Sequence, residues 1–396
     1  MSLLSIIQKT YIVPLIVGYT FLVSGVVIWI LQACCLVIWP FSKSLYRRCV
    51  CVLAYQHWVQ MVFLFDHWAK AEIIFYHDGK LVDFLAKEHS LIVMNHRFDV
   101  DFLVTWSTCQ KFGILGSSKS FVKEELKYIP IVGWGFSLIE MVFLKRNFQK
   151  DRKALVDGIS ILKDYPLKSW MLLFCEGTRF TKQKQEKANE VAREKGLKEL
   201  NHHLLPRTKG FSVITQAMKG VVPAVYDVTL CCKDDPTFMQ VMSAKKLTFH
   251  LLVKRIPAED IPTDNDDDSA AFCHKLYQEK DEAVNHFHEH GTLDGYQGKY
   301  KPLTLKNNSG PVSVVLFWST LLFTPFAYYL MYLLYTGSMY TYIVLTICTY
   351  LVYLLCKRMI SETVSSKGST YGSTISNGSA TKQETQNSTN QVEKKD

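Results

Sequence analysis

Residues 11–41 contain no Lys, Arg, Asp or Glu, and this uncharged stretch limits the possible folds of the chain more than any other feature. About 20 consecutive apolar residues suffice to cross the hydrocarbon core of a bilayer. A cleaved signal peptide needs a basic leading segment and a short apolar core. Lys9 is the only basic residue before this stretch, which is too long for the core of such a peptide. We therefore expect a spanning or deeply embedded helix within residues 1–45.

Two further apolar runs, at residues 312–335 and 339–356, predict a C-terminal transmembrane hairpin over residues 311–357. Lysines precede the pair, and Lys357 and Arg358 follow it. Since basic residues favour the cytoplasmic side, a hairpin with basic ends and an uncharged tip keeps both ends in the cytoplasm. A buried helical hairpin of a soluble core is the alternative, but Tyr, Phe and Trp crowd the ends as at a membrane interface.

Three other segments follow from composition. Residues 46–72 carry aromatic side chains among few charges, which predicts an interfacial amphipathic segment or, alternatively, an ordinary buried helix. Residues 73–300 are expected to form the main domain, and residues 358–396 a disordered tail with little to bury. The acidic run at 264–268 predicts the start of a helix that ends at His290, since it lacks the Gly and closing Glu of a calcium loop.

Short apolar runs alternate with segments of helical periodicity in the main domain. This alternation predicts an α/β fold with a mainly parallel sheet flanked by helices. The expected strands lie at residues 73–76, 91–94, 113–116, 140–144, 171–175 and 221–226.

Several classes of protein are excluded by missing motifs. The chain has 11 cysteines but no Cys-x-x-Cys, which argues against a disulfide framework or a zinc ribbon, and we predict no metal site. It lacks the Gly-x-Ser-x-Gly elbow of serine hydrolases, the Walker loop and the dinucleotide glycine fingerprint. The net charge of +9 accompanies membrane runs, so we expect lipid rather than nucleic acid as the partner.

The apolar run at 91–94 ends in Asn95 and His96, and Asp101 follows four residues after the histidine. A histidine with a nearby carboxylate is the usual pairing of a general base with the group that orients it. Five positions on an ideal helix correspond to about 140° of rotation, so the two side chains meet only if His96 precedes the helix. The sequence assigns no role to Asp99.

Three more apolar runs adjoin polar groups. Lys145 and Arg146 follow the second, the tetrapeptide 176–179 follows the third, and Val222 and Pro223 begin the fourth. Ligands of open α/β sheets bind beyond the carboxyl ends of the strands. The cations therefore predict a pocket for an anionic substrate, with surface cations near a membrane as the alternative.

Residues 179–209 contain nine Lys or Arg against four Glu. We expect a solvated, charged helix at 182–200, although attraction to anionic lipid or to the nucleotide end of a cofactor is also compatible. Arg207 and Lys209 add two cations in the turn that follows.

Together these residues resemble the glycerolipid acyltransferase family, and most closely the 1-acylglycerol-3-phosphate acyltransferases of the animal gamma/delta/epsilon group. The resemblance spans residues 1–360 and rests on His-x4-Asp at 96–101, Phe143 to Arg146, Glu-Gly-Thr-Arg at 176–179 and Val-Pro at 222–223. The first and third motifs together are specific to this family.

The resemblance implies transfer of a fatty acyl group from acyl-CoA to the sn-2 hydroxyl of lysophosphatidic acid, which gives phosphatidic acid and CoA. His96 is then the general base, and Asp101 holds its tautomer. Acyl-CoA is a co-substrate, and no cofactor is implied. CoA thiolate leaves readily, so no acyl-enzyme is needed.

The remaining motif residues receive binding roles from the same resemblance. Arg179, with Lys145 or Arg146, is expected to hold the lysolipid phosphate, and Gly177 and Thr178 to present backbone amides to it. The substrate-binding set also includes Glu176, which would orient Arg179 or the glycerol. Contacts with acyl-CoA or lipid are expected from Arg207, Lys209 and Pro223. Many relatives have a small or polar residue in place of Lys145.

The resemblance further implies a multi-pass protein of the endoplasmic reticulum membrane, with Golgi or nuclear envelope as further locations and the catalytic domain in the cytoplasm. Two alternatives stay open. The acceptor is another lysophospholipid, such as lysophosphatidylinositol or lysocardiolipin, or the protein binds membrane lipid without catalysis. No particular protein partner is predicted.

Overall fold

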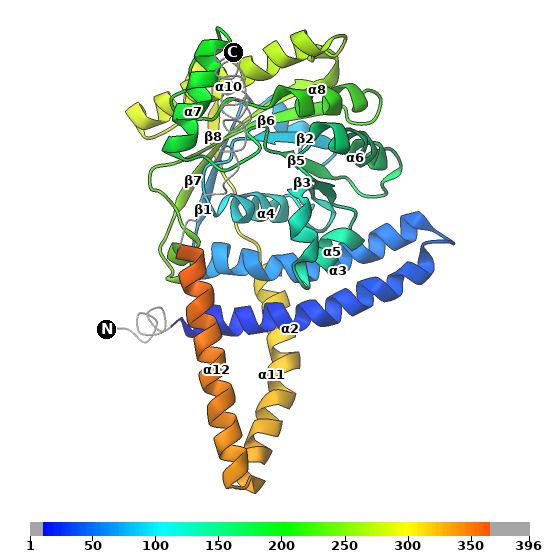
Figure 1. Ribbon diagram of the computed structural model, residues 1–396, viewed down its shortest axis with the longest axis vertical. Coiled ribbons are helices and arrows are strands. Elements are labelled where there is room, and N and C mark those ends of the chain that lie inside the picture. Colours follow the sequence, from blue (N-terminus) through cyan, green and yellow to red (C-terminus); the bar gives the residue numbers. More distant parts are fainter. Residues whose placement is uncertain (1–10, 365–396) are drawn as a thin grey trace, which may run out of the picture. The chain divides into compact units, whose positions relative to one another are not determined.

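The structure, a computed structural model, describes residues 11–364 and contains an eight-stranded sheet in the order β4-β3-β5-β2-β6-β7-β1-β8 (Figure 1). Neighbouring strands from β4 to β6 are parallel, β7 is antiparallel to β6, and β1 and β8 complete the other side. The predicted α/β fold with a mainly parallel sheet is therefore confirmed. The strands are β1 Glu72–His77, β2 Ser90–Met94, β3 Lys119–Lys123, β4 Val142–Leu144, β5 Trp170–Leu173, β6 Ala224–Cys232, β7 Thr248–Pro257 and β8 Lys301–Thr304.

Helices cover both faces of this sheet (Figure 1). One face packs against α3 and α4, and the other against α6, α8 and α10. The helices are α2 Ile12–Cys34, α3 Lys43–Phe63, α4 Asp101–Lys111, α5 Val132–Leu138, α6 Phe148–Ser160, α7 Lys182–Glu194, α8 Thr208–Ala217, α9 Phe238–Met242, α10 Asp266–His290, α11 Gly310–Thr336 and α12 Met339–Val364.

Strand β2 shows how sequence alternation builds the two cores. Ile92 and Met94 point into the core beside α3 and α4, whereas Leu91 and Val93 point into the core beside α6, α8 and α10. Successive side chains of a strand face opposite sides of the sheet, so a strand buried on both faces reads as a continuous apolar run. The strand is therefore central, and the residues after Met94 emerge at the middle of the sheet edge.

The expected helix from the acidic run to His290 is confirmed as α10. Asn265 accepts the backbone N–H of Asp268 at 2.7 Å, three aspartates occupy the first turn, and Gly291 ends the helix with φ of 70°. Negative charge at a helix N-terminus and a glycine in the left-handed conformation after its last turn are both stabilising.

The strand expected at 113–116 is wrong, because Leu115–Ser117 forms a short 3-10 turn and β3 begins only at Lys119. The glycines explain the difference. Gly113 has φ of 72°, and a Cβ on Gly116 would lie 2.2 Å from the Cys51 carbonyl oxygen, so this segment packs closely on α3. Strands β7 and β8 were not expected, and β8 extends the sheet beyond the predicted domain end at residue 300.

Among the described residues, three helical segments are long and apolar enough to cross a membrane: Ile12–Ile38, Lys43–Trp68 and Gly310–Thr336. The second was expected to be interfacial, but 61% of its most apolar window is buried inside the protein, as the alternative of a buried helix requires. Thr20 of α2 hydrogen-bonds Ser319 of α11 at 3.1 Å, and Gln60 of α3 donates to Ser24 of α2 at 2.8 Å. Figure 1 shows α11 leaving this group and extending away from the sheet.

Two of these helical segments join the sheet at the edge where β2 ends. Strand β1 is antiparallel to β2, so its amino end, which follows α3, lies at that edge. Strand β8 is antiparallel to β1, so its carboxyl end, which leads to α11, lies there as well. Residues after Met94 therefore emerge on the side of the sheet that faces the apolar helices.

Helix α12 belongs to a separate unit that begins at Gly337, and its apolar part is Met339–Leu351. The pairing of α11 and α12 as a transmembrane hairpin stays a prediction. Residues 358–364, expected in the disordered tail, belong to α12, and the rest of that tail lies outside the described residues.

Candidate active site

His96 and Asp101 are in direct contact at the carboxyl end of β2. His96 Nδ1 donates to Asp101 Oδ2 at 2.8 Å. His96 lies in the loop before α4, and Asp101 is the first residue of that helix, so the chain turns between them. Asn95 fixes the start of this loop because its amide exchanges two hydrogen bonds, of 3.0 and 2.7 Å, with the backbone of Leu230 on β6.

The carboxylate of Asp101 organises the loop as well as the imidazole. Its Oδ2 also accepts the backbone N–H groups of Arg97 at 2.8 Å and Phe98 at 3.1 Å. Burial raises the pKa of Asp101, while its hydrogen bonds with His96 and the two amides act in the opposite direction. Because Nδ1 carries the proton that Asp101 accepts, Nε2 of the neutral ring is left as the basic nitrogen.

The imidazole of His96 is both held and accessible. It stacks on the ring of Phe174, with centroids 4.3 Å apart, and its side chain remains 29% exposed. A base must reach its proton within hydrogen-bond distance, so this partial exposure is compatible with general-base chemistry.

Glu176 holds the backbone at the histidine in place and does not lie among the anion-binding groups. Its Oε1 accepts the N–H of His96 at 2.9 Å, and its Oε2 accepts the N–H of Leu204 at 3.1 Å. Burial raises the pKa of Glu176 to about 8, against the effect of these two bonds. Both oxygens accept hydrogen bonds from the backbone, so Glu176 positions the histidine loop, and its expected role toward Arg179 or the glycerol stays a prediction.

The turn at Gly177 also differs from the expectation. Gly177 has φ of 68°, and its N–H donates to the Phe174 carbonyl at 3.0 Å, so this amide is engaged within the turn. A Cβ at this position would lie 2.9 Å from Cδ and Nε of Arg207, which therefore lies directly over the glycine. The turn contacts the histidine loop through the Phe180 N–H, which donates to the His96 carbonyl at 2.8 Å.

Three cations converge beside this turn. Lys184 donates to Thr178 Oγ1 at 2.8 Å and to the Arg179 carbonyl at 3.1 Å. Its pKa is lowered, first by burial and then by the positive charges of Arg179 and Arg146. Mutual repulsion of this kind marks a site that an anion would stabilise. Lys145, by contrast, pairs with Glu124 at 3.6 Å.

The sequence did not single out Lys184, which was expected on a solvated helix. Its position carried a signal, since Thr181 caps α7 by accepting the Lys184 N–H at 3.3 Å. A lysine three residues after a capping threonine lies in the first turn of the helix, close to the preceding turn.

Three other sequence candidates lie apart from this cluster or serve the fold. Pro223 directly precedes β6, which runs parallel to β2, so Pro223 lies at the opposite edge of the sheet from His96. The carboxyl end of β6 lies beside the histidine loop, where Leu230 bonds Asn95. Lys209 Nζ lies 5.8 Å from the centre of the Phe148 ring. Asp99 accepts the N–H of Phe238 at 3.3 Å and so supports the start of α9.

A buried lysine of α10, also missed, supports the same strand ends. Lys280 is fully buried, forms an ion pair of 2.6 Å with Asp227, and donates to the carbonyls of Val228 at 2.6 Å and Val93 at 3.1 Å. It thereby ties the carboxyl end of β2 to the middle of β6. Its spacing from Cys273, Leu276 and Tyr277 places it on the apolar face of α10, which signals a buried charge.

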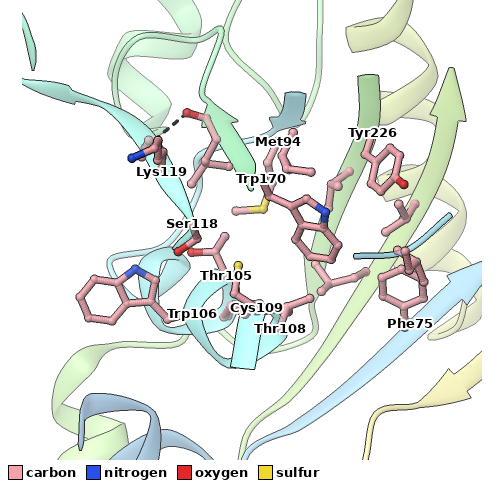
Figure 2. Close-up of a pocket in the computed structure, with 18 of the residues that line it drawn as sticks. Phe75, Met94, Thr105, Trp106, Thr108, Cys109, Ser118, Lys119, Trp170 and Tyr226 are labelled. Carbon is pink, nitrogen blue, oxygen red and sulfur yellow. Dashed lines mark hydrogen bonds between the residues drawn. The ribbon is translucent and has the colours of Figure 1, made fainter. Parts of the chain in front are cut away.

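An apolar pocket of about 70 Å³ lies between α4 and the sheet (Figure 2). Met94 of β2, Thr105 and Cys109 of α4 and Trp170 of β5 converge on it. Met94 is two residues before His96, so the wall of the pocket is continuous with the histidine loop. In residues 11–364, no group of three or more His, Cys, Asp or Glu side chains is placed to hold a metal ion.

Comparison with known proteins decides the family. The acyltransferase family model matches residues 76–233, and the model of the acyltransferase C-terminus matches residues 240–318. Human 1-acyl-sn-glycerol-3-phosphate acyltransferase gamma is 41% identical over 94% of this chain and 98% of its own length. The chain belongs to the acyltransferase family.

A second relative supports this assignment. The bovine 1-acyl-sn-glycerol-3-phosphate acyltransferase delta is 39% identical over 94% of this chain and 97% of its own length. A crystal structure of the 1-acyl-sn-glycerophosphate acyltransferase PlsC from Thermotoga maritima aligns with a TM-score of 0.41 and 16% identity, covering 68% of this chain and 95% of that one. These relatives confirm the predicted resemblance to the gamma and delta 1-acylglycerol-3-phosphate acyltransferases. The membrane association of the family agrees with the apolar helices found here.

Proposed function

We propose that this acyltransferase transfers a fatty acyl group from acyl-CoA to the sn-2 hydroxyl of lysophosphatidic acid, which gives phosphatidic acid and CoA. The observation that carries the proposal is the His96–Asp101 contact beside the cations of Arg146, Arg179 and Lys184. The names of the gamma and delta relatives support the same reaction.

The chemistry begins with the hydroxyl, which is a poor nucleophile at neutral pH. His96 Nε2 removes its proton as the oxygen attacks the thioester carbonyl, and Asp101 stabilises the imidazolium that forms. The tetrahedral intermediate then collapses, the carbon–sulfur bond breaks, and the imidazolium returns the proton to the CoA thiolate. The proton balance is closed, and no acyl-enzyme is required.

The phosphate of the lysolipid fits the three converging cations. Arginine presents a planar pair of donors to phosphate oxygens, and lysine adds a point charge. Arg179 and Lys184 share the turn that contacts the His96 carbonyl through Phe180, so a phosphate bound there lies close to the base. We assign Arg207, which lies over Gly177, and Lys209, in the first turn of α8, to the phosphates of CoA.

The apolar pocket suits part of a fatty acyl chain. Its lining is dominated by aliphatic, aromatic and sulfur-containing side chains. Each buried methylene group contributes about 0.8 kcal/mol, so even part of a chain binds appreciably. The apolar helices join the sheet at the edge that carries His96, which lets the lysolipid chain remain in the bilayer while its head group reaches the base.

A panel of acceptors tests the proposal directly. Purified full-length protein is given radiolabelled oleoyl-CoA with lysophosphatidic acid, lysophosphatidylinositol, lysocardiolipin or lysophosphatidylcholine. We expect lysophosphatidic acid to give the highest kcat/KM, and a tenfold preference for another acceptor would replace it. Absence of turnover with every acceptor would support the lipid-binding alternative.

A charge variant tests the phosphate site. Arg179→Ala is expected to raise the KM for lysophosphatidic acid about tenfold or more, since a charge-assisted hydrogen bond contributes about 1.5–3 kcal/mol. Arg193→Ala is the matched control, because Arg193 lies on the same charged segment but pairs with Glu199 at 2.8 Å. A loss of acyl-CoA affinity alone in Arg179→Ala would contradict the assignment.

We further propose that the protein resides in the endoplasmic reticulum, and also in the Golgi or nuclear envelope, with its catalytic domain in the cytoplasm. The basic residues that flank the apolar runs support this orientation. Asn307 stands in an Asn-x-Ser sequon just before α11. It should stay unglycosylated in microsomes, and an endoglycosidase-sensitive band shift that Asn307→Gln removes would reverse the topology.

A further inference from the structure

The connection between β3 and β4 exposes large apolar side chains that the proposed chemistry does not use. It consists of a short 3-10 helix, Glu124–Tyr128, followed by α5. Tyr128 is 72% exposed, Ile129 44% and Trp134 39%. We infer that this connection, residues 124–138, inserts into the interfacial layer of the lipid bilayer beside α2.

The connection is attached to the apolar helices by specific packing. Trp134 packs on Trp29 of α2, with ring centroids 4.8 Å apart. A Cβ on Gly25 of α2 would lie 2.5 Å from Cγ2 of Ile131 and 2.6 Å from Nε2 of His57 on α3, so Ile131 fills the space between these two helices.

The backbone shows that this packing is maintained at a cost. Ile131 has φ of 68°, which is rare for a β-branched residue and persists only where the surroundings enforce it. The connection is therefore a built part of the α2–α3 surface rather than a loosely exposed loop.

The surface that it presents is continuous with that of α2. Val26 and Ile30, next to Trp29 on that helix, are 41% and 49% exposed. The apolar segment that contains α2 is long enough to cross a membrane and is mostly unburied by the protein. Side chains that adjoin Trp29 thus extend a face for which lipid is already the expected neighbour.

Topology places the connection on the membrane side of the domain. It leaves the sheet at the carboxyl end of β3, which is parallel to β5 and thereby to β2. This is the edge that carries His96 and the junctions with α3 and α11.

The composition of the connection favours lipid over a protein partner. Tyr and Trp concentrate at the head-group level of membranes, where their rings are apolar and their polar atoms remain wet. Its two acidic residues are compensated, Glu124 by Lys145 at 3.6 Å and Glu125 by Lys123 at 2.9 Å. Lys127 then adds a positive charge that suits anionic lipid.

Insertion would also steady the substrate site. The connection leads into β4, after which come Lys145 and Arg146, and the Glu124–Lys145 pair ties its start to that end of the strand. A bilayer that holds residues 124–138 therefore helps to hold Arg146, one of the cations that the proposed function assigns to the lysolipid phosphate.

Photo-cross-linking tests the insertion without relying on activity. Full-length protein carrying benzoylphenylalanine in place of Tyr128 is reconstituted into vesicles of phosphatidylcholine and phosphatidylserine and irradiated. The control position is Val82, which is 43% exposed but follows β1, whose carboxyl end is at the opposite edge of the sheet. We expect lipid adducts at position 128 at least several-fold above those at 82. Equal yields, or cross-links at 128 only to protein, would overturn the inference.

A paired activity assay tests the consequence and rests on the proposed function. Tyr128→Ser combined with Ile129→Ser should lower acyl transfer to lysophosphatidic acid in vesicles about tenfold, while transfer in detergent micelles stays within twofold of wild type. Val82→Ser should change neither assay. Equal losses in vesicles and micelles would show a folding or site effect and reject the membrane role, whereas inactivity of the wild type in both would reject the function alone.

Discussion

Replacing Asp101 by asparagine changes one atom of the side chain and is the sharpest perturbation of the proposed base. Asp101 Oδ2 accepts His96 Nδ1 and two backbone N–H groups. In Asp101→Asn the remaining oxygen can still accept these three N–H groups, but the negative charge is lost. Nε2 stays the basic nitrogen, and no carboxylate then stabilises the imidazolium that forms when it takes the proton.

The magnitude follows from the lost charge. The imidazolium formed during the reaction lies against a carboxylate whose nearest oxygen is 2.8 Å from Nδ1. Two unit charges about 4 Å apart, at an effective dielectric constant of about 20, attract by about 4 kcal/mol. Since each 1.36 kcal/mol is a factor of ten in rate, we expect kcat to fall about 1,000-fold.

The assay measures acyl transfer from labelled oleoyl-CoA at saturating lysophosphatidic acid, with thermal unfolding measured on the same preparations. Asp99→Asn is the matched control, since Asp99 lies two residues away and bonds the backbone of Phe238 instead of His96. It should change kcat by no more than about threefold, as expected for substitutions outside a site. An Asp101→Asn variant within tenfold of wild type, or an equal loss in Asp99→Asn, would refute the reasoning.

Three further predictions concern the groups around the base. Lys280→Met leaves Asp227 buried without its partner, so the free energy of unfolding should fall by about 3–5 kcal/mol in chemical denaturation, and adding Asp227→Leu should restore most of it. Gly177→Ala strains a residue at φ of 68° and displaces Arg207, so the free energy of unfolding should fall by about 1–2 kcal/mol and the KM for acyl-CoA should rise. Burial lowers the pKa of His203 from 6.5 to about 4, so the unfolded chain takes up this proton first and stability is lost as pH falls from 6.5 to 4. That loss should be about 3 kcal/mol and should be absent in His203→Asn.

The strand-end logic predicted the base because it depends on local sequence. An apolar run buried on both faces has to end where polar residues begin, which placed His96 at an edge of the sheet and Asp101 in the following helix. The same reasoning failed to place Pro223. This residue begins a strand parallel to β2, so it lies at the edge of the sheet opposite to the one where β2 ends. The reasoning also did not predict that Glu176 binds the backbone of His96 and Leu204, which are distant from it in sequence.

Features that depend on tertiary contacts were beyond the sequence. Strand β7 is set by its antiparallel pairing with β6, and β8 by pairing with β1, both determined by partners rather than by composition. The pocket arises only when α4 covers the face of the sheet. The position of Lys280 on the apolar face of α10 signals a buried charge. Its partners, Asp227 and two backbone carbonyls, lie on β2 and β6, so no pattern within α10 specifies them.

The most direct test of the central claim is the rate of acyl transfer by His96→Ala compared with His89→Ala. Both histidines flank β2, but His89 lies at its amino end and accepts the N–H of Ser169 at 3.3 Å. General-base catalysis contributes about 100- to 10,000-fold, so kcat of His96→Ala should fall by that range with unfolding unchanged, while His89→Ala keeps most of its activity. Phosphatidic acid formation by folded His96→Ala at a rate near that of wild type would contradict the account.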